Sequence, residues 1–323
     1  MERDLFNMSN LAPIILFVYN RPEHTRKTVE ALAANSLAKD SDLFIFVDGS
    51  KNESARPAVE SVRKYVELIR GGGGFKSVTI TAHDKNQGLA NSVIAGITSV
   101  LNSHDRAIIV EDDIVTSPYF LNFMNDALEM YKDDLQVCTI DAYHKDFKFD
   151  PETMPPTFFY PFYDIWGWGT WARAWKDFNP DAAYLLAALQ EKNLIYSFDL
   201  DSNNPVYSKM LEAQRDGKID SWAVRWYATN FLLGRLSLHT GISYTKNIGF
   251  DGSGVHYTKK IYWLPEKEIA KSYAPLKRIP VEINHKVFEV FKAADRKEKA
   301  PRSLPYRAVR KLYRIIKSFF VRY

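Results

Sequence analysis

The sequence contains a single cysteine, Cys138, so no disulfide bond can form within the chain. One thiol is typical of proteins from a reducing compartment. The first residues, MERDLFNMSNLAP, include acids and lack the apolar core of a secretory signal. No apolar run approaches the roughly 20 residues that are needed to span a bilayer. These absences predict a cytoplasmic protein, which would reach a membrane only through a partner or a surface segment.

Several catalytic and metal-binding motifs are also missing. There is no Cys/His cluster with zinc spacing and no GxSxG nucleophile elbow. The glycine run at 71–74 lacks the GxxxxGK[ST] pattern and follows a predicted helix, so we interpret it as a connection and not as a phosphate loop. With 46 % hydrophobic and 25 % charged residues, the chain of 323 residues has the composition of a globular protein with a large core.

The formal net charge of +4 is distributed unevenly. From residue 301 to 323 the chain has seven basic residues and no acid, so the remainder carries −3. Wound as a helix, residues 303–323 are amphipathic, with Val309, Leu312 and Ile316 on one side. Such a helix can lie on an anionic membrane surface, or it can pack on the body with its basic face in water. Because the excess charge is confined to this tail, we expect no nucleic-acid partner.

Strand-like and helical segments alternate over residues 12–143. The strand-like segments are apolar or β-branched, and Pro22 marks the start of the first helix. This alternation predicts an α/β fold with a mostly parallel sheet flanked by helices, in which ligands bind at the carboxyl ends of the strands. The predicted strands are 12–20, 42–50, 76–84, 106–110 and 136–143, and the predicted helices are 21–35, 55–70, 88–101 and 117–132.

The second half of the chain is rich in aromatic residues. The segment 157–175 contains Trp166, Trp168, Trp171 and Trp175, for most of which core packing is the simpler account. Its glycines, Gly167 and Gly169, suggest backbone that runs close to a ligand. Predicted helices near 181–192, 204–215 and 220–234 follow, and then a strand-like, glycine-rich stretch at 237–258. We see no linker, and therefore predict one continuous domain up to residue 260 with a trailing segment at 261–323.

Three consecutive acids, Glu111, Asp112 and Asp113, follow the fourth predicted strand. Like charges this close repel one another unless a positive charge lies among them. The triplet is therefore either a solvated acidic turn or a cation site. At the carboxyl end of a parallel strand, a hard divalent cation such as Mn²⁺ or Mg²⁺ can be held by one or two carboxylates together with phosphate oxygens.

Two further residues at strand ends are candidates for contact with a nucleotide. Asp48 ends the second strand and can accept a hydrogen bond from a base or a ribose hydroxyl, or can simply be a turn aspartate before glycine. Arg21 follows the first strand and can pair with phosphate or stack on a base, or can be a surface arginine at a helix start.

Two candidates lie further along the chain. Asp220 is positioned either to cap a helix or to act as a general base toward a hydroxyl group. The stretch NIGFDGSGVHYTKK at 247–260 combines glycines with His256 and two lysines, so it can close over a diphosphate. A lone histidine in a loop is more often neither a metal ligand nor a phosphate partner.

In chain order these segments resemble the GT-A glycosyltransferases, in particular those related to N-acetylglucosaminyltransferase I and the bacterial family-2-like sugar transferases. The resemblance covers about residues 12–258. It rests on the ordered segments ILFVYNRPEHTRKTVEAL, FIFVDGSKNES, HDKNQGLANSVIAGI, AIIVEDDIVTSPYFLNFM, WGWGTW, DSWAVRWY and ISYTKNIGFDGSGVH.

The resemblance implies a metal-dependent, inverting transfer of a sugar from a nucleotide-sugar, with UDP as the expected nucleotide. The implied acceptor is a hydroxyl of a glycan or lipid-linked saccharide in bacterial surface polysaccharide assembly, which would suit a peripheral position on the inner face of the plasma membrane. It also implies a nucleotide-sugar-binding half at 12–143 and an acceptor and catalytic half at 144–260, followed by the C-terminal extension 261–323 with its basic amphipathic helix.

The resemblance also suggests a role for each candidate residue. Asp113 would be the direct ligand of Mn²⁺ or Mg²⁺, with His256 as the second. Asp220 would be the catalytic base, although the relatives have two acids before the tryptophan and here the second is Ser221. The donor would be held by Arg21 and Asp48 at the base, Asp112 at the ribose, Glu111 near the nucleotide or sugar, and Asn86, Gly252 and Lys259.

Two other functions remain open at this point. A sugar nucleotidyltransferase would have a glycine-rich signature with Arg or Lys directly after the first strand, and VYNRPEH lacks it. A carbohydrate-binding or scaffold protein without catalysis would not need the acid triplet together with Asp220.

Overall fold

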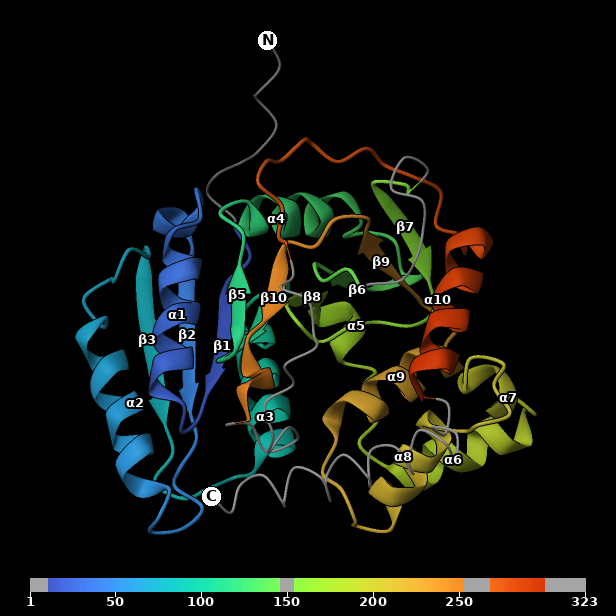
Figure 1. Cartoon of the computed structure of the whole chain (residues 1–323), viewed down its shortest axis with the longest axis horizontal. Coiled ribbons are helices and arrows are strands. Elements are labelled where there is room, and N and C mark those ends of the chain that lie inside the picture. The colour runs from blue at the N-terminus through green and yellow to red at the C-terminus, as the bar shows by residue number, and fades with distance from the viewer. Residues whose placement is uncertain (1–10, 146–153, 253–267, 300–323) are drawn as a thin grey trace, which may run out of the picture.

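The structure is a computed structural model that describes residues 11–145, 154–252 and 268–299. Within these residues the centre is a mixed sheet of eight strands in the order β3-β2-β1-β4-β8-β6-β9-β7 (Figure 1). A separate two-stranded ribbon pairs β5 with β10. The strands are β1 (Ile14–Val18), β2 (Asp42–Val47), β3 (Ser77–Ala82), β4 (Arg106–Glu111), β5 (Ile114–Thr116), β6 (Val137–Asp141), β7 (Thr157–Tyr160), β8 (Trp168–Trp171), β9 (Leu236–Thr240) and β10 (Thr245–Asn247).

Six strands of the main sheet point in one direction. Parallel pairing joins β3, β2, β1 and β4, and β6 is parallel to β9. Because β8 lies between β4 and β6 and is antiparallel to both, β6 and β9 keep the direction of β4. In the described sheet, β8 and the edge strand β7 run the other way. The predicted α/β sheet is therefore confirmed, with two antiparallel strands added, and the carboxyl ends of six strands meet at one edge.

Each face of the sheet is covered by its own set of helices. In β1 the side chains of Ile14, Leu16 and Val18 enter one core, and those of Ile15 and Phe17 enter the other, as strand alternation requires. The first core is closed by α1 (Pro22–Ala33), α2 (Arg56–Leu68) and α4 (Phe120–Met130). The second is closed by α3 (Leu89–Leu101), α5 (Ala172–Trp175), α6 (Ala182–Glu191), α7 (Ile195–Phe198), α8 (Tyr207–Arg215), α9 (Trp222–Leu232) and α10 (His285–Lys299).

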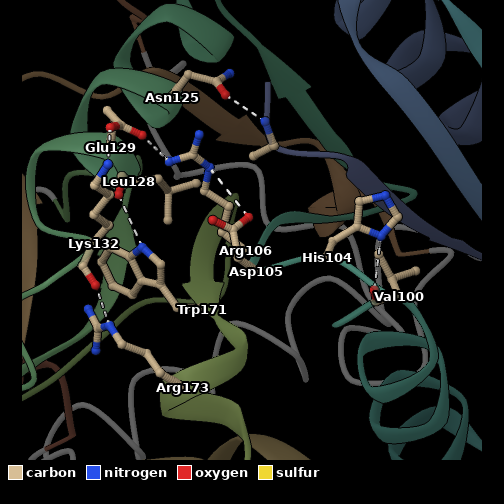
Figure 2. Close-up of polar contacts among 11 residues, drawn as sticks. Val100, His104, Asp105, Arg106, Asn125, Leu128, Glu129, Lys132, Trp171 and Arg173 are labelled. Atoms are coloured by element: carbon tan, nitrogen blue, oxygen red, sulfur yellow. Dashed lines mark hydrogen bonds and ion pairs between the residues drawn. The ribbon is translucent and has the colours of Figure 1, made fainter. Parts of the chain in front are cut away.

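The amino end of β4 is fixed to α4 by polar contacts, which Figure 2 shows. Arg106 is buried at the start of the strand and pairs with Glu129 of α4. Trp171 of β8 donates its Nε1–H to Leu128 O at 3.1 Å. These contacts hold the centre of the sheet at the end opposite to the predicted site residues.

The aromatic segment 157–175 belongs to the sheet, since it contains β7 and β8. Three of its four tryptophans, Trp168, Trp171 and Trp175, are buried in the cores. A Cβ atom on Gly169 would stand 2.8 Å from Met124 Cε and 3.2 Å from Ala107 O. Close packing of β8 on β4 and α4 therefore accounts for this glycine, and the suggestion that it brings backbone toward a ligand is not needed.

The described part of the trailing segment, 268–299, packs on the body. It passes over α4 and ends in α10 (Figure 1). Ser117, the first residue of the predicted helix 117–132, donates its hydroxyl to Ala270 O at 2.6 Å, and α4 begins only at Phe120. Tyr273 donates to Asp126 of α4. No helix in the described residues is long and apolar enough to cross a membrane.

Candidate functional site

Asp48, directly after β2, holds the loop that leads into α3. Its carboxylate accepts hydrogen bonds from the backbone N–H groups of Gly49 and Gln87, both at 2.8 Å, and of Gly88 at 3.2 Å. Asn86 Nδ2 donates to the same carboxylate at 2.9 Å. Four donors use the acceptor capacity of a buried carboxylate. Asp48 and Asn86 thus lie together at the predicted edge, and their contact with a nucleotide stays a prediction.

The acid triplet is neutralised in part by Arg21. Its guanidinium pairs with Asp112 and lies 3.0 Å from Asp113 Oδ2 through the same nitrogen, Nη2. Burial lowers the pKa of Arg21, but the two carboxylates outweigh burial and raise it above its ordinary value. Thr28 of α1 donates its hydroxyl to Asp112 O at 2.8 Å. The positive charge that the three acids require is therefore supplied, at least in part, by the chain itself.

Glu111 is the least compensated of the three acids. Burial, followed by the charges of Asp113 and Asp112, raises the pKa of Glu111 to about 8, and Arg21 only partly opposes this. Burial also raises the pKa of Asp112, again against the effect of Arg21. Strong perturbation of neighbouring carboxyl groups at the end of a strand is typical of functional sites.

A short segment after β10 covers the acid triplet. Ile248 donates its backbone N–H to Asp113 O at 2.9 Å, which continues the β5–β10 ribbon toward the site. A Cβ atom on Gly249 would stand 2.2 Å from Asp113 Oδ2, so only glycine fits there. Asp251 Oδ2 lies 3.2 Å from His24 Nε2 of α1. Gly252 ends this described segment in a left-handed conformation with φ +94°.

Asp220 does not cap α9. Ser221 is the N-cap, and its hydroxyl accepts the N–H of Val224 at 3.4 Å. The Asp220 side chain is 52 % exposed, and its Oδ2 lies 3.3 Å from the position that a Cβ atom on Gly88 would take. The helix-cap interpretation of Asp220 is therefore wrong, because the neighbouring serine performs that task. The carboxylate is left beside the loop that Asp48 holds.

A divalent cation can be held by a cluster of protein side chains, or by one or two carboxylates together with diphosphate oxygens. The residues present fit the second mode. Within the described residues there is no group of three or more His, Cys, Asp or Glu side chains that could hold a metal ion. Arg21 pairs with Asp113 through Oδ2, so the Asp113 carboxylate would be shared between Arg21 and a cation. Mg²⁺ bound to a diphosphate typically uses only one or two protein carboxylates, so a single carboxylate ligand is sufficient.

Some predicted residues fall outside the described part of the chain. These are His256, Lys259 and the basic tail 303–323.

Trp166 is the one tryptophan of segment 157–175 that is partly exposed. It packs edge-on against Tyr143 and Phe250, with ring centroids 4.5 and 5.5 Å away.

Sequence reasoning missed three residues of the site. Gly249 and Gly88 lie against Asp113 and Asp220, and both occur in stretches whose glycines look like ordinary turn residues. Arg225 lies 3.6 Å from Asp220, although WAVRW reads as a core helix with one polar position. The sequence offered one indication of Arg225: it lies four residues after Ser221, and this spacing places both side chains on the same face of a helix.

The sheet and the residues at its carboxyl edge define a GT-A fold, in which the acid triplet follows β4. The model of the family described as "Glycosyl transferase family 2" matches residues 14–179, which is just over half of the chain. The chain belongs to this family, which confirms the predicted family and class of enzyme. No curated protein matches the chain.

The solved structures that the chain matches share little sequence with it. The TarS protein of S. aureus has 10 % identity over 74 % of this chain and 37 % of its own, with a TM-score of 0.41. A shorter form of TarS has 12 % identity over 72 % of this chain and 59 % of its own, with a TM-score of 0.40. The mannosyltransferase PcManGT from Pyrobaculum calidifontis, in complex with GDP-Man and Mn²⁺, has 10 % identity over 71 % of this chain and 77 % of its own, with a TM-score of 0.36. The chain thus spans less than two thirds of either TarS chain.

Proposed function

We propose that this protein transfers a sugar from a UDP-sugar to a hydroxyl of a glycan or lipid-linked saccharide in bacterial surface polysaccharide assembly. The observation that carries the proposal is the grouping of Arg21, Asp112 and Asp113 at the carboxyl edge of the sheet, in a chain of glycosyl transferase family 2. Asp48 and Asn86 would contribute to donor binding on one side of this group by holding the loop at 86–88 in place.

In this proposal Asp113 and His256 would hold Mn²⁺ or Mg²⁺. Such an ion would supply Lewis-acid stabilisation of the negative charge on the departing diphosphate. Arg21 supplies a second positive charge at the same place, since it already contacts Asp112 and Asp113. Glu111 and Asp112 face the nucleotide-sugar, and Gly252 and Lys259 belong to the segment that covers it.

Asp220 is the proposed general base. Its carboxylate is half exposed and beside Gly88, so an acceptor hydroxyl can reach it. It takes the proton from that hydroxyl while the oxygen attacks the anomeric carbon, and the nucleotide diphosphate leaves from the opposite face. A single displacement of this kind inverts the configuration at the anomeric carbon.

We further propose that residues 1–260 form the transferase domain and that 261–323 is an extension. The extension would bring the protein to the inner face of the plasma membrane through its basic tail. A membrane surface suits an acceptor that is linked to lipid.

Donor hydrolysis tests the proposed function. UDP-, GDP- and dTDP-sugars are titrated with and without Mn²⁺, and nucleotide release is measured. We expect hydrolysis of UDP-sugars that requires Mn²⁺ and falls about 100-fold or more in Asp113→Ala, since loss of a charge-stabilising group typically costs that much. The matched control is Asp105→Ala, which removes an exposed aspartate at the other end of β4 (Figure 2).

Two other outcomes would change the proposed function. Hydrolysis of a GDP- or dTDP-sugar in place of UDP-sugars would change the donor but keep the reaction. Nucleotide binding that is indifferent to both Mn²⁺ and Asp113 would show that the acid triplet is not a metal site, and a scaffold without catalysis would then be the better account.

A further inference from the structure

Helix α9 contains a buried arginine with an unused donor. Arg225 is 8 % exposed. Its Nε donates to Ser221 O at 3.0 Å and its Nη1 to Pro180 O at 3.4 Å. Its Nη2 is buried but has no hydrogen-bond partner among the described residues. An arginine anchored at two of its nitrogens has little freedom to turn, so the third nitrogen has a nearly fixed position.

The unused donor is directed at the proposed base. Arg225 Nη2 lies 3.6 Å from Asp220 Oδ1, which is longer than a hydrogen bond but well within the range of an ion pair. Burial lowers the pKa of Arg225, and the charge of Asp220 opposes that effect. Within the part of the chain that the structure describes, Asp220 is the acid that raises the pKa of this guanidinium, so we take it as the charge partner of Arg225.

The other oxygen of Asp220 is directed at the loop before α3. Its Oδ2 lies against Gly88, whose N–H is held by Asp48 at 3.2 Å. The carboxylate thus stands between a fixed guanidinium on one side and a fixed backbone on the other. A general base works only when it is ionised and correctly aimed at the proton that it removes.

We infer that Arg225 is the positioning residue of Asp220, holding its carboxylate in the orientation that accepts the acceptor's proton. The inference rests on the proposed function, because it takes Asp220 as the base. A shift of about 0.7–0.9 Å would close the 3.6 Å separation into a charge-assisted hydrogen bond. Arg225 itself touches neither donor nor acceptor in this arrangement.

A double-mutant cycle on activity tests this inference. Release of the nucleoside diphosphate is measured for the wild type, Asp220→Asn, Arg225→Met and the double variant: UDP with UDP-glucose, UDP-galactose or UDP-N-acetylglucosamine as donor, and GDP with GDP-mannose. We expect Asp220→Asn to lower kcat about 100-fold or more, as for loss of a general base. Arg225→Met should lower kcat about 10-fold with little change in KM, and the double variant should match Asp220→Asn, because residues that act as a unit are not additive.

Two further variants separate positioning from structural support. Arg225→Lys keeps the positive charge and should recover part of the lost kcat. Arg173→Met is the matched control, because Arg173 also donates to backbone carbonyl groups, at Lys132, Val137 and Tyr131. The effects of Arg173→Met and Asp220→Asn on kcat should be independent, so the variant with both substitutions should show the product of the two single effects.

The same cycle on unfolding gives a readout that is independent of activity. If Arg225 and Asp220 are paired, the effect of the double substitution on the unfolding equilibrium constant should differ from the product of the two single effects by a factor of about two or more. Multiplicative behaviour in this cycle overturns the inference, and so does multiplicative behaviour in activity. Full activity of Asp220→Asn, or no donor hydrolysis by the wild type, would instead reject the proposed function, and the unfolding cycle would then decide whether the two side chains are paired.

Discussion

Asp141 at the end of β6 is a carboxyl group in surroundings that disfavour its charge. It is fully buried, and neither of its oxygens makes a hydrogen bond of normal geometry with the described residues. His239 Nε2 lies 3.3 Å away, but burial lowers the pKa of this histidine to about 3, and the same nitrogen is 2.8 Å from Phe162 O. Burial and then the charge of Asp164 raise the pKa of Asp141 well above its ordinary value, which favours the protonated form of the carboxyl group.

We expect Asp141→Asn to stabilise the protein increasingly as the pH rises. Because the folded-state pKa exceeds the unfolded one, the wild type takes up a proton on folding above about pH 4 and loses up to about 1.4 kcal/mol of stability per pH unit. The amide has no such cost. Urea unfolding at pH 5, 6, 7 and 8 measures the difference between the two proteins. A difference that does not change with pH would show that the carboxyl group is already compensated in the folded chain.

Single residues at strand ends could be predicted because topology constrains them. Arg21, Asp48 and the triplet at 111–113 follow parallel strands, and such residues must meet at one edge. The roles of Asp220 and Ser221 could not be separated in this way, because both residue types cap helices and a shift of one position decides between them. Only the backbone geometry at the start of α9 resolves this.

At the scale of elements, alternation of strands and helices predicted β1, β2, β3, β4 and β6. The strand-like stretch at 237–258 contains β9 and β10, but β7 and β8 were missed. β8 was missed because it has only four residues and includes Gly169, and glycine is depleted in strands. Its insertion between β4 and β6 joins residues far apart in sequence, which local periodicity cannot reveal. Helix α10 was overlooked for a different reason, since the trailing segment was taken as an extension outside the body.

Phe291 tests whether α10 belongs to the folded body. It is fully buried, and its ring lies 4.8 Å from that of Tyr160 in β7 and 5.3 Å from that of Phe162. We expect Phe291→Ala to lower the free energy of unfolding by about 3–5 kcal/mol, since it empties a packed core position. Tyr184→Ala, at a 60 % exposed aromatic residue of α6, should cost far less. If urea unfolding showed the same small loss of stability for both variants, α10 would be only loosely attached to the body.

At the scale of the whole molecule, the body and the basic tail pose separate questions. Lys145 pairs with Asp295, and Lys292 pairs with Asp201, so α10 is attached to the second half of the chain by charge as well as by packing. Although the proposed domain boundary lies at residue 260, α10 therefore contributes to the stability of the folded body. A chain that ends at residue 299 keeps these contacts and removes the seven basic charges of the tail.

That shortened chain allows the membrane proposal to be tested without disturbing the site. We expect the full chain to sediment with vesicles of phosphatidylglycerol but not of phosphatidylcholine, because each basic residue near an anionic surface contributes about 1 kcal/mol. The binding should weaken as salt is added and should disappear in the chain ending at 299, while both chains release UDP at the same rate. Replacing Arg310, Lys311 and Arg314 with glutamine keeps the apolar side of the helix and should remove most of the binding. If the full chain bound neither kind of vesicle, the alternative of a tail packed on the body would hold, and the acceptor would have to reach the site in solution.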